Sequence, residues 1–473
     1  MERHRVGLAL IAAIVLAVAV PAGVQASGFQ LVEQNGSGLG NAFAGQAAGV
    51  RDASAIFFNP AALTRINGRQ FVVSVEPIGV GTDFADARSA RPFLPVATGL
   101  VLPVSVGGPG GDAGAWIPVP NGYVSWRVAN PVWLGLGVNA PFGLKTEWDP
   151  DWIGRFHAVK SEVRTVNLNP TVAVRLSEAL AVGAGANYQR LDAELTQSVA
   201  YGGIAFGAAG ALGGPAAAAA ILAQLGPAGL GYEGLGRVKG DSWAWGWNAG
   251  AMLRLGEAAR LGVSYRSKVK HDLDGTATFE QAPVFATGGP VGPLGAGLNA
   301  RFATGAVRTE IELPDTFSVA AAYEGGRFEI LADWTRTGWS SIQDLAIART
   351  DGTALSSVPL RFKDTWRAGL GLNYRLDDRR ILRLGTAWDV SPVRDEFRTP
   401  RLPDEDRAWA AAGFEWKLGQ KTAIDVGYAH LFLDKATSDR PNQESPTSAP
   451  AGALVGEYSA KVDILSVQFR VSF

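Results

Sequence analysis

The last sixteen residues of the chain, from Tyr458 to Phe473, alternate between apolar and polar side chains. The apolar positions are Leu465, Val467, Phe469, Val471 and Phe473. The positions between them are Ser466, Gln468, Arg470 and Ser472. A period of two predicts a β-strand with one apolar face and one polar face. The fold must therefore contain a sheet that separates an apolar environment from a polar one.

Segments with similar alternation occur along most of the chain and give fourteen candidate strands in all. They lie at residues 70–80, 119–128, 131–140, 162–175, 179–195, 240–255, 259–279, 308–323, 326–340, 361–376, 379–390, 407–417, 420–433 and 458–473. In one of them, Trp366 and Leu370 alternate with Arg367 and Gly371. Charged residues on only one face predict water or a ligand on that side of the sheet and lipid on the other.

The connections between these strands are alternately short and long. Short turns are expected at Ala129-Asn130, Ser177-Glu178, Gly256–Ala258, Gly325, Asp377-Asp378 and Gly419. Long segments fill the other gaps, at residues 81–118, 141–161, 196–239, 280–307, 341–360, 391–406 and 434–457. This sorting predicts an all-β fold, a fourteen-stranded antiparallel transmembrane β-barrel with long loops at one end, over residues 70–473. A β-sandwich gives no reason for such sorting.

Residues 1–26 have the features of a secretory signal peptide. Arg3 and Arg5 form a basic start, residues 6–20 are apolar, and Val24-Gln25-Ala26 fits a cleavage site. The apolar run is shorter than the roughly 20 residues of a spanning helix, and no later segment is expected to form one. Cysteine is absent, which excludes disulfides and thiolate metal sites. The net charge of −1 gives no indication of nucleic-acid binding.

Residues 27–69 lack the alternation of a strand and are rich in Gly, Ala and Ser. A fourteen-stranded barrel is wide enough to leak unless something fills it. These residues are therefore predicted to form a hatch, or plug, in the lumen. Gly36, Gly38 and Gly40 do not indicate a nucleotide-binding loop, because no strand precedes them and no βαβ unit follows.

Several motifs of the mature chain occur together in one known family. They are Gly28-Phe29-Gln30-Leu31, Gly36-Ser37-Gly38-Leu39-Gly40 with Ala42 and Phe43, Asn59-Pro60-Ala61, Pro141-Phe142-Gly143-Leu144 with Glu147-Trp148, Asn167-Leu168-Asn169-Pro170, and the terminal Phe473. In these motifs the chain resembles the outer-membrane long-chain fatty-acid transporters of the FadL/TodX type. A terminal Phe is also typical of strands delivered to the barrel assembly machinery.

This resemblance implies a monomeric fourteen-stranded barrel in the outer membrane of a Gram-negative bacterium. It also implies a hatch that contains Phe29 and the motif Asn59, Pro60 and Ala61. Hydrophobic molecules would pass down their gradient, without a cofactor or energy coupling. The expected partners are the hydrophobic ligand, outer-membrane lipid and, during biogenesis, the barrel assembly machinery.

Pro141 follows directly on the predicted strand 131–140. Proline supplies no N–H to a β-ladder, and Gly143 packs no side chain. In the family, an inward kink of this strand makes a lateral opening through which ligand leaves. Asn139, Pro141, Phe142 and Gly143 are the candidates for that kink. The alternative is that Pro141 only ends the strand.

Most of the loop at residues 196–239 is uncharged, because no charged residue occurs from Leu195 to Tyr232. Pro215 and Gly226 predict the start and end of a short helix with Ile221, Leu222 and Leu225 on it. So apolar a loop is expected either to bind an apolar molecule or to pack on its neighbours. By resemblance, this loop and 141–161 form a first ligand groove. Its expected lining is Trp148, Trp152, Ile153 and Phe156, although aromatics at a loop end also serve as interface anchors.

A desolvated fatty-acid carboxylate needs a cation or several N–H donors. Arg190 lies where the family places an arginine that contacts the carboxylate. Counting by twos from Val182, however, puts Arg190 on the lipid-facing side unless a bulge intervenes. Snorkelling to the membrane interface is the structural alternative.

No enzyme is predicted, because His157, His271 and His430 show neither paired metal-ligand spacing nor a nucleophile motif. We therefore expect no catalytic residue and no metal, although a lipase or protease barrel stays open. The expected function is passive uptake of hydrophobic molecules, with long-chain fatty acids as the first candidate. Aromatic hydrocarbons or alkanes are the alternative cargo, and a polar-solute porin or a structural barrel is the alternative of another class.

Overall fold

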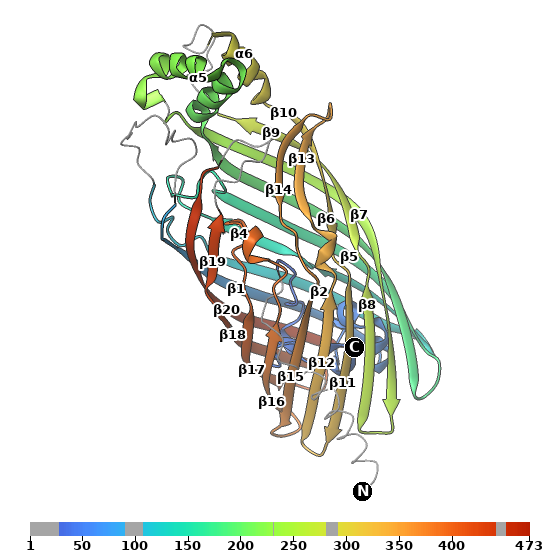
Figure 1. Cartoon of the computed structure of the whole chain (residues 1–473). Helices are drawn as coiled ribbons and strands as arrows, with labels where there is room; N and C mark the ends of the chain where they lie inside the picture. The colour runs from blue at the N-terminus through green and yellow to red at the C-terminus, as the bar shows by residue number, and fades with distance from the viewer. Residues whose placement is uncertain (1–27, 90–106, 230, 281–291, 441–450) are drawn as a thin grey trace.

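The computed structural model describes the whole chain except residues 1–27, 90–106, 230, 281–291 and 441–450. The predicted signal peptide, residues 1–26, therefore lies outside the described residues. The described chain forms a single sheet of twenty strand segments. Figure 1 shows this sheet closed on itself, with α5 (Tyr201–Gly229) and α6 (Gly292–Arg301) at one end and short hairpin turns at the opposite end.

Fourteen of the segments pair in a ring, each with the next one along the ring and the last with the first. They are β1 (Arg69–Asp86), β2 (Trp116–Ala129), β3 (Val132–Asn139), β5 (Lys160–Arg175), β6 (Leu180–Val199), β7 (Gly234–Leu255), β8 (Ala259–Arg266), β11 (Thr316–Gly325), β12 (Phe328–Thr337), β15 (Thr365–Arg375), β16 (Arg380–Asp389), β17 (Arg407–Lys417), β18 (Thr422–Leu433) and β20 (Leu454–Ser472). All these pairings are antiparallel, and β1 with β20 closes the ring. The predicted fourteen-stranded barrel is confirmed.

Six further segments extend the wall at the long-loop end. They are β4 (Gly143–Glu147), β9 (Val269–Phe279), β10 (Gly305–Leu313), β13 (Asp344–Arg349), β14 (Ala354–Pro359) and β19 (Ala436–Arg440). The loops predicted at 280–307 and 341–360 therefore contain strand residues. The sequence did not indicate these strands, because their outer face contacts water. Such strands do not need the apolar outer side chains that produce an alternating pattern.

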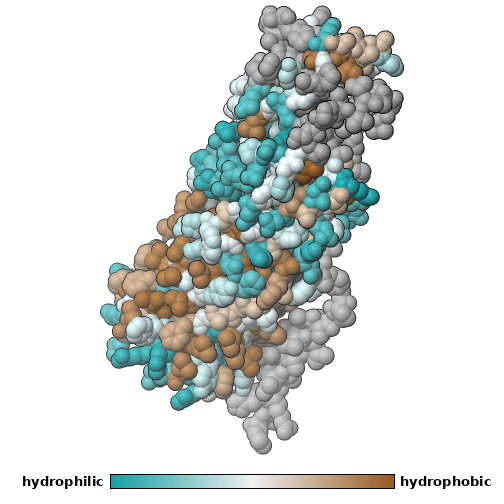
Figure 2. All heavy atoms as spheres, turned by 90° about the vertical axis from the view of Figure 1, so that its left-hand side faces the viewer, coloured by the Kyte–Doolittle hydropathy of each residue, from teal (hydrophilic) through white to brown (hydrophobic). Residues whose placement is uncertain are grey.

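The side chains of the ring strands alternate as predicted. On β20, Leu465 and Val467 are exposed outward, whereas Ser466 and Gln468 are buried inward. Trp243, Trp245 and Trp247 point outward from β7 and are also exposed. Figure 2 shows an apolar surface over the lower part of the barrel and a hydrophilic one above it. An apolar band bordered by aromatic residues is the pattern of a transmembrane barrel.

Residues 28–68, called the hatch below, lie inside the ring as short helical turns. These are α2 (Gly36–Leu39), α3 (Gln46–Gly49), α4 (Ala55–Phe58) and η1 (Pro60–Arg65). Asn59 donates from Nδ2 to the carbonyls of Ala47 at 2.6 Å and of Ala251 on β7 at 3.1 Å. Arg51 pairs with Glu324 and Glu329, both at 2.8 Å. The hatch is thus fastened to the wall by side-chain contacts.

Wall glycines make room for the backbone of the hatch. A Cβ atom at Gly262 would lie 1.9 Å from the carbonyl oxygen of Ala47, and one at Gly385 would lie 2.1 Å from the carbonyl carbon of Asn41. No real side chain tolerates such distances. The hatch can therefore occupy this position only because the wall carries no side chain there.

The long-loop end carries α5 (Tyr201–Gly229) and α6 (Gly292–Arg301), with η4 (Trp339–Ser341) and η5 (Asp395–Phe397) in other loops. Figure 1 shows α5 and α6 at the tip, away from the hairpin turns. Only a short helix from Pro215 to Gly226 was predicted, because Pro and Gly were taken as its start and end. The observed helix starts at Tyr201 and bends at Gly214, whose φ is 70°. Residues Tyr201–Gly226 have the length and hydropathy of a membrane-spanning helix, contrary to expectation, yet they lie at the tip of the molecule (Figure 1).

Candidate functional site

The ladder between the second and third strands of the ring is incomplete. β2 pairs with β3 only as far as Gly122 and Val138, although β2 continues to pair with β1 up to Trp116. Beyond the interruption at residues 140–142, β4 pairs with β5. No ladder joins β2 to β4 in the described part of the chain. The wall therefore has a lateral gap between these two segments, next to the predicted kink.

Three prolines account for the gap. Pro141 interrupts the third strand where a kink was predicted. Pro118 of β2 lies opposite Pro77 of β1, and two prolines cannot exchange backbone hydrogen bonds. Pro118 and, two residues on, Pro120 must therefore direct their peptide groups away from β1, toward β4. Since neither has an N–H, this edge of β2 lacks two of the donors that a ladder would need.

The first described residues of the hatch occupy this interruption. Gly28–Gln34, called the leading segment below, forms a short antiparallel bridge with the kink between Gln30 and Phe142. The N–H of Leu31 donates to the carbonyl of Pro141 at 2.8 Å, and that of Gly143 to the carbonyl of Phe29 at 3.0 Å. The side-chain amide of Gln34 adds a bond to the carbonyl of Ala140 at 2.9 Å. The leading segment thus satisfies backbone groups that the interrupted strand leaves free.

A cavity of about 600 Å³ follows the gap. Its lining includes the leading segment and Asn139, which is buried. It also includes Val138 and Val166, whose side chains are exposed on the outer face of the wall. This cavity, called the exit cavity below, therefore connects the lumen with the lipid-facing surface.

Phe29 connects the leading segment to an aromatic cluster. Its ring centroid lies 5.0 Å from that of Trp339 and 5.9 Å from that of Phe142. Phe142 and Trp339 also meet edge to face at 6.2 Å. Two residues predicted for different roles, Phe29 in the hatch and Phe142 in the kink, are thus in contact. Moving the leading segment would break this cluster.

Phe29 also lines a second cavity, of about 110 Å³, with a mainly apolar lining. We call it the acyl cavity. Its apolar residues are Phe29, Leu144, Val163, Leu191, Ala193, Leu195, Val238, Leu273, Val307, Ile311, Ile342, Leu345, Ile347, Leu360, Phe362 and Leu402. Since Phe29 lines both the acyl cavity and the exit cavity, it separates them.

Arg401 is a buried cation on the lining of the acyl cavity. Its guanidinium donates to Ser161 Oγ at 3.0 Å and to Gln197 Oε1 at 2.7 Å, which are neutral acceptors. No carboxylate among the described residues pairs with it, and burial lowers the pKa of Arg401 to about 10. Arg401 is therefore still charged at neutral pH and lacks a counter-ion. The other two cations of this lining, Lys239 and Arg308, have acidic partners.

Sequence reasoning did not single out Arg401. One signal was available: it is a lone cation between two prolines in Thr399-Pro400-Arg401-Leu402-Pro403. That signal does not show that the loop folds inward over the lumen. Only the tertiary structure brings Arg401 next to Ser161 of β5.

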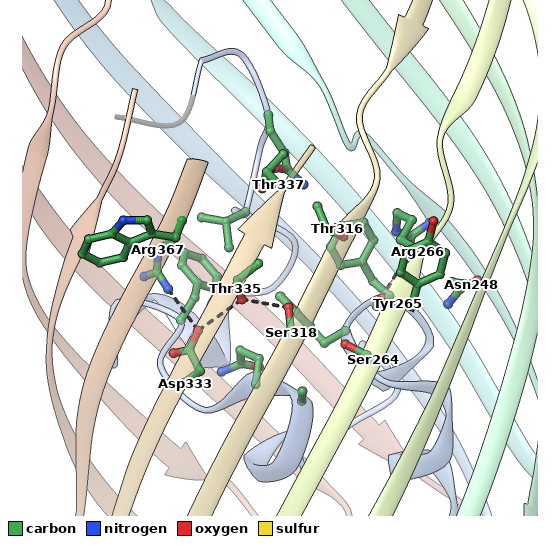
Figure 3. A pocket seen from close by; sticks show the side chains of 18 of the residues that line it. Asn248, Ser264, Tyr265, Arg266, Thr316, Ser318, Asp333, Thr335, Thr337 and Arg367 are labelled. Atoms are coloured by element: carbon green, nitrogen blue, oxygen red, sulfur yellow. Dashed lines mark hydrogen bonds and ion pairs between the residues drawn. The ribbon is translucent and has the colours of Figure 1, made fainter. Parts of the chain in front are cut away.

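A third cavity, of about 100 Å³, lies between the hatch and the wall (Figure 3). Six serines and threonines of the wall line it: Ser264, Thr316, Ser318, Thr335, Thr337 and Thr365. Ser318 and Thr335 share a hydrogen bond of 2.7 Å, and Arg367 pairs with Asp333 at 3.6 Å. We call this the hydroxyl chamber. Gln30, Leu31 and Val32 line both this chamber and the exit cavity, so the leading segment borders all three cavities.

The structure corrects the expected position of Arg190. Its neighbours Gln189 and Leu191 are buried inward, whereas Arg190 lies outside the wall. There it pairs with Asp192 at 2.8 Å and Asp241 at 3.4 Å. β6 has no bulge at this point that would turn it inward. A carboxylate inside the barrel therefore cannot contact Arg190. The position of Arg190 beside the outward-facing Trp243 fits the alternative that its side chain snorkels to the membrane interface.

The aromatic residues expected to line a groove in loop 141–161 are buried in the loop itself. Trp148 and Trp152 stack with ring centroids 4.3 Å apart. The indole N–H of Trp152 donates to the carbonyl of Ala158 at 2.7 Å. Trp148, Trp152 and Ile153 belong to one buried cluster, and Phe156 is also buried. In this conformation they stabilise the loop and do not line an open groove.

Two of the three groove residues predicted on α5 are also buried within the loops. Ile221 and Leu225 are buried against Leu298 and Phe302 at the α6 end, so here the self-packing alternative describes the structure. Leu222 is half-buried, and Leu212 is 80% exposed. The exposed apolar surface of this loop is therefore carried by residues other than Ile221 and Leu225.

Comparison with known proteins agrees with this architecture. Residues 17–473 match the family described as outer membrane protein transport protein (OMPP1/FadL/TodX). A long-chain fatty acid transport protein of Escherichia coli is 28% identical over 428 residues, 86% of this chain and 87% of that protein. Outer membrane protein P1 of Haemophilus influenzae is 29% identical over 429 residues, 86% of this chain and 86% of that protein.

Solved structures show the same fold. A Pseudomonas aeruginosa FadL homologue superposes with a TM-score of 0.81 at 25% identity, over 94% of this chain and 100% of that one. The CymD monoaromatic hydrocarbon channel has a TM-score of 0.62 at 18% identity, over 94% and 99%. Since the family match extends over nearly the whole sequence, this chain is an outer-membrane β-barrel that belongs to the OMPP1/FadL/TodX family of transport proteins.

Proposed function

We propose that this protein takes up long-chain fatty acids and releases them sideways into the outer membrane. One observation carries the proposal: a single segment of seven residues, Gly28–Gln34, closes the wall gap and borders every cavity described above. Ligand and leading segment would therefore compete for the same space. Because the ring closes within one chain, we take the monomer as the working unit.

The acyl cavity suits a fatty acid at both ends of the molecule. Its aliphatic lining would bury the hydrocarbon tail, at about 0.8 kcal/mol for each CH₂ group removed from water. Arg401 would hold the carboxylate, since it is already desolvated and lacks an acidic partner. A charge-assisted hydrogen bond of this kind contributes roughly 1.5–3 kcal/mol. The cavity thus favours an amphiphile with one terminal anion.

Ligand in the acyl cavity would press on Phe29, which with Leu144, Val163 and Leu402 also lines the exit cavity. Displacing Phe29 breaks the contacts with Trp339 and Phe142 and withdraws the two backbone bonds at the kink. The gap between β2 and β4 then opens to the lumen, and the tail can pass into lipid. The body of the hatch would stay in place, held by Asn59, Arg51 and the wall glycines.

The other candidate cargo is an uncharged hydrocarbon. The aromatic cluster around Phe29 would accept it, but an uncharged molecule would leave Arg401 without a counter-ion. This difference separates the two candidates. The test is uptake by protein reconstituted into liposomes, with a labelled long-chain fatty acid and toluene offered in parallel.

We expect Arg401→Gln to weaken fatty-acid uptake at low concentration by roughly tenfold or more, from the size of a charge-assisted bond, and to leave toluene passage unchanged. Arg190→Gln is the matched control, since Arg190 lies outside the lumen, and should behave as wild type. Equal loss of both cargoes in Arg401→Gln would point to damaged folding. Unchanged fatty-acid uptake would contradict the proposed role of Arg401.

A further inference from the structure

The hydroxyl chamber exists because several neighbouring strands are interrupted at one level of the wall. β8 ends at Arg266 and its continuation β9 starts at Val269. β11 starts at Thr316, just after Pro314, which has no N–H to extend the ladder. β12 ends at Thr337 and β15 starts at Thr365, and these two residues are paired. The interruptions lie side by side, because Arg266 pairs with Thr316 and Thr316 with Thr337.

The chamber has one mainly apolar side and one mainly polar side. The hatch contributes Leu31, Val32, Phe43, Phe57 and Phe58, with Gln30 and Gln46 among them. The wall contributes the six serines and threonines together with Tyr265, Asn248, Arg266, Asp333, Arg367 and Asp389, with Ala249 and Trp366 among them. Figure 3 shows the wall side chains at the two ends of the chamber, with Arg367 and Asp333 at one end and Arg266 and Asn248 at the other. A space with these two sides matches an amphiphile better than it matches water or a hydrocarbon.

The two arginines of the chamber differ in their partners. Arg367 pairs with Asp333 and also donates to the carbonyl of Ala42. Arg266 is 91% buried, with a relative exposure of 9%. It donates to Asn187 Oδ1 and, at 3.1 Å, to the carbonyl of Phe57. No Asp or Glu in the part of the chain that the structure describes pairs with Arg266.

Arg266 therefore has capacity for an anion. A guanidinium has five N–H groups, and the bonds to Asn187 and Phe57 use two of them, while its central carbon lies 4.2 Å from the centroid of the Phe57 ring. A desolvated cation without a counter-ion is costly, and a carboxylate would remove that cost. The neighbouring hydroxyls of Ser264 and Thr316 could donate further hydrogen bonds to the same oxygens.

We propose that the hydroxyl chamber is a second binding site for the carboxylate of an amphiphile, with Arg266 as its cation. This inference rests on the proposed function and adds a second carboxylate-binding site after Arg401. The leading segment again forms the boundary, because Gln30, Leu31 and Val32 line both this chamber and the exit cavity. A carboxylate on Arg266 would keep the head group in the lumen while the tail extends into the exit cavity.

The test uses the full mature protein in lipid nanodiscs and a long-chain fatty acid labelled with ¹³C at the carboxyl carbon. Wild type should give two protein-bound carboxyl resonances, distinct from that of fatty acid dissolved in lipid. Arg266→Gln should remove one of them and Arg401→Gln the other. Arg190→Gln should keep both, and Arg266→Lys should keep the second resonance at a shifted frequency.

The outcomes distinguish this inference from the proposed function. Two resonances in Arg266→Gln, with one lost in Arg401→Gln, would overturn the second site alone. No bound resonance in any variant would overturn both. Acetate labelled in the same way separates an amphiphile site from a general oxyanion site, and acetate binding at the affinity of the fatty acid would overturn the amphiphile assignment. If Arg266→Gln fails to fold, Thr316→Val/Thr365→Val should weaken the same resonance, and an unchanged resonance would overturn the proposal.

Discussion

Glu33, in the leading segment, is a carboxyl group held in the lumen beside the exit cavity. Burial raises the pKa of Glu33 from 4.5 to about 7, with smaller opposing effects from Arg407 and Arg367 and a reinforcing one from Asp389. When the leading segment is released, Glu33 meets water and its pKa returns toward 4.5. Protonation therefore favours the docked segment. Docking is strongest below pH 4.5 and weakens as the pH rises through about 7.

This predicts a pH-dependent release of the leading segment. The chain has no cysteine, so a nitroxide on Gln30→Cys reports this segment alone. Its mobile fraction should rise between pH 4.5 and about 7 and then level off. Glu33→Gln, which is neutral at every pH, should flatten the profile. The same rise in Glu33→Gln would contradict the assignment.

A second prediction at the scale of single residues concerns the close contact between Gly262 of the wall and the hatch. Gly262→Val would place a side chain into the carbonyl of Ala47, which has no room to give. Overpacking of this kind costs roughly 1–3 kcal/mol, and we expect the hatch to lose its seal. Steady ion conductance should appear in planar bilayers, whereas wild type stays closed. Val263→Ala, on the outward face of the same strand, is the control and should stay closed too.

The elements of the wall show how far the sequence predicts this molecule. The alternation of apolar and polar residues predicted the fourteen ring strands, and Pro141 predicted the kink, because both features depend on local sequence. The contribution of Pro118 and Pro120 could not be predicted, since it depends on the register that sets Pro118 opposite Pro77. Arg266 could have been found by counting by twos from Gly262, which puts it inward. Arg401 could not, because a loop carries no such periodicity.

The helical tip is predicted to matter for capture and not for folding. α5 packs on α6 and on the ends of strands, and it has no part in the ring. Replacing residues 203–228 with a short Gly-Ser linker should therefore leave a heat-modifiable, folded barrel. The initial rate of uptake should fall several-fold at low ligand concentration and recover at saturating ligand. Wild-type rates at low concentration would show that the exposed apolar surface of this loop has no role in capture.

At the scale of the whole molecule, the protein combines a barrel, a hatch body and one short leading segment. The leading segment lies at the wall gap and, through Phe29, between the acyl cavity and the exit cavity. Arg51, Asn59 and Gln468 fasten the hatch body to the wall. The leading segment bonds to the kink through Leu31, Phe29 and Gln34. It also accepts hydrogen bonds from the wall side chains of Asn121, Tyr123 and Thr337. On the proposed function, transport requires neither a large movement of the hatch nor an open pore, and ligand would pass into lipid at the gap between β2 and β4.

The most direct test of this account is to lock the leading segment onto the kink. Gln30 and Phe142 face each other as a non-hydrogen-bonded antiparallel pair, because the backbone bonds lie on the residues beside them. Such pairs have Cα atoms about 4.5 Å apart, within the range that a disulfide spans. Gln30→Cys/Phe142→Cys should therefore form a cross-link in a chain that otherwise has no cysteine.

The measurement is fatty-acid uptake by liposomes that contain this variant, oxidised and then reduced, with both single-cysteine variants as controls. The account predicts that the oxidised protein binds fatty acid but does not release it into lipid, and that reduction restores uptake. The single-cysteine variants should not respond to oxidant. Equal uptake by the oxidised and reduced forms would contradict the claim that the leading segment is the gate.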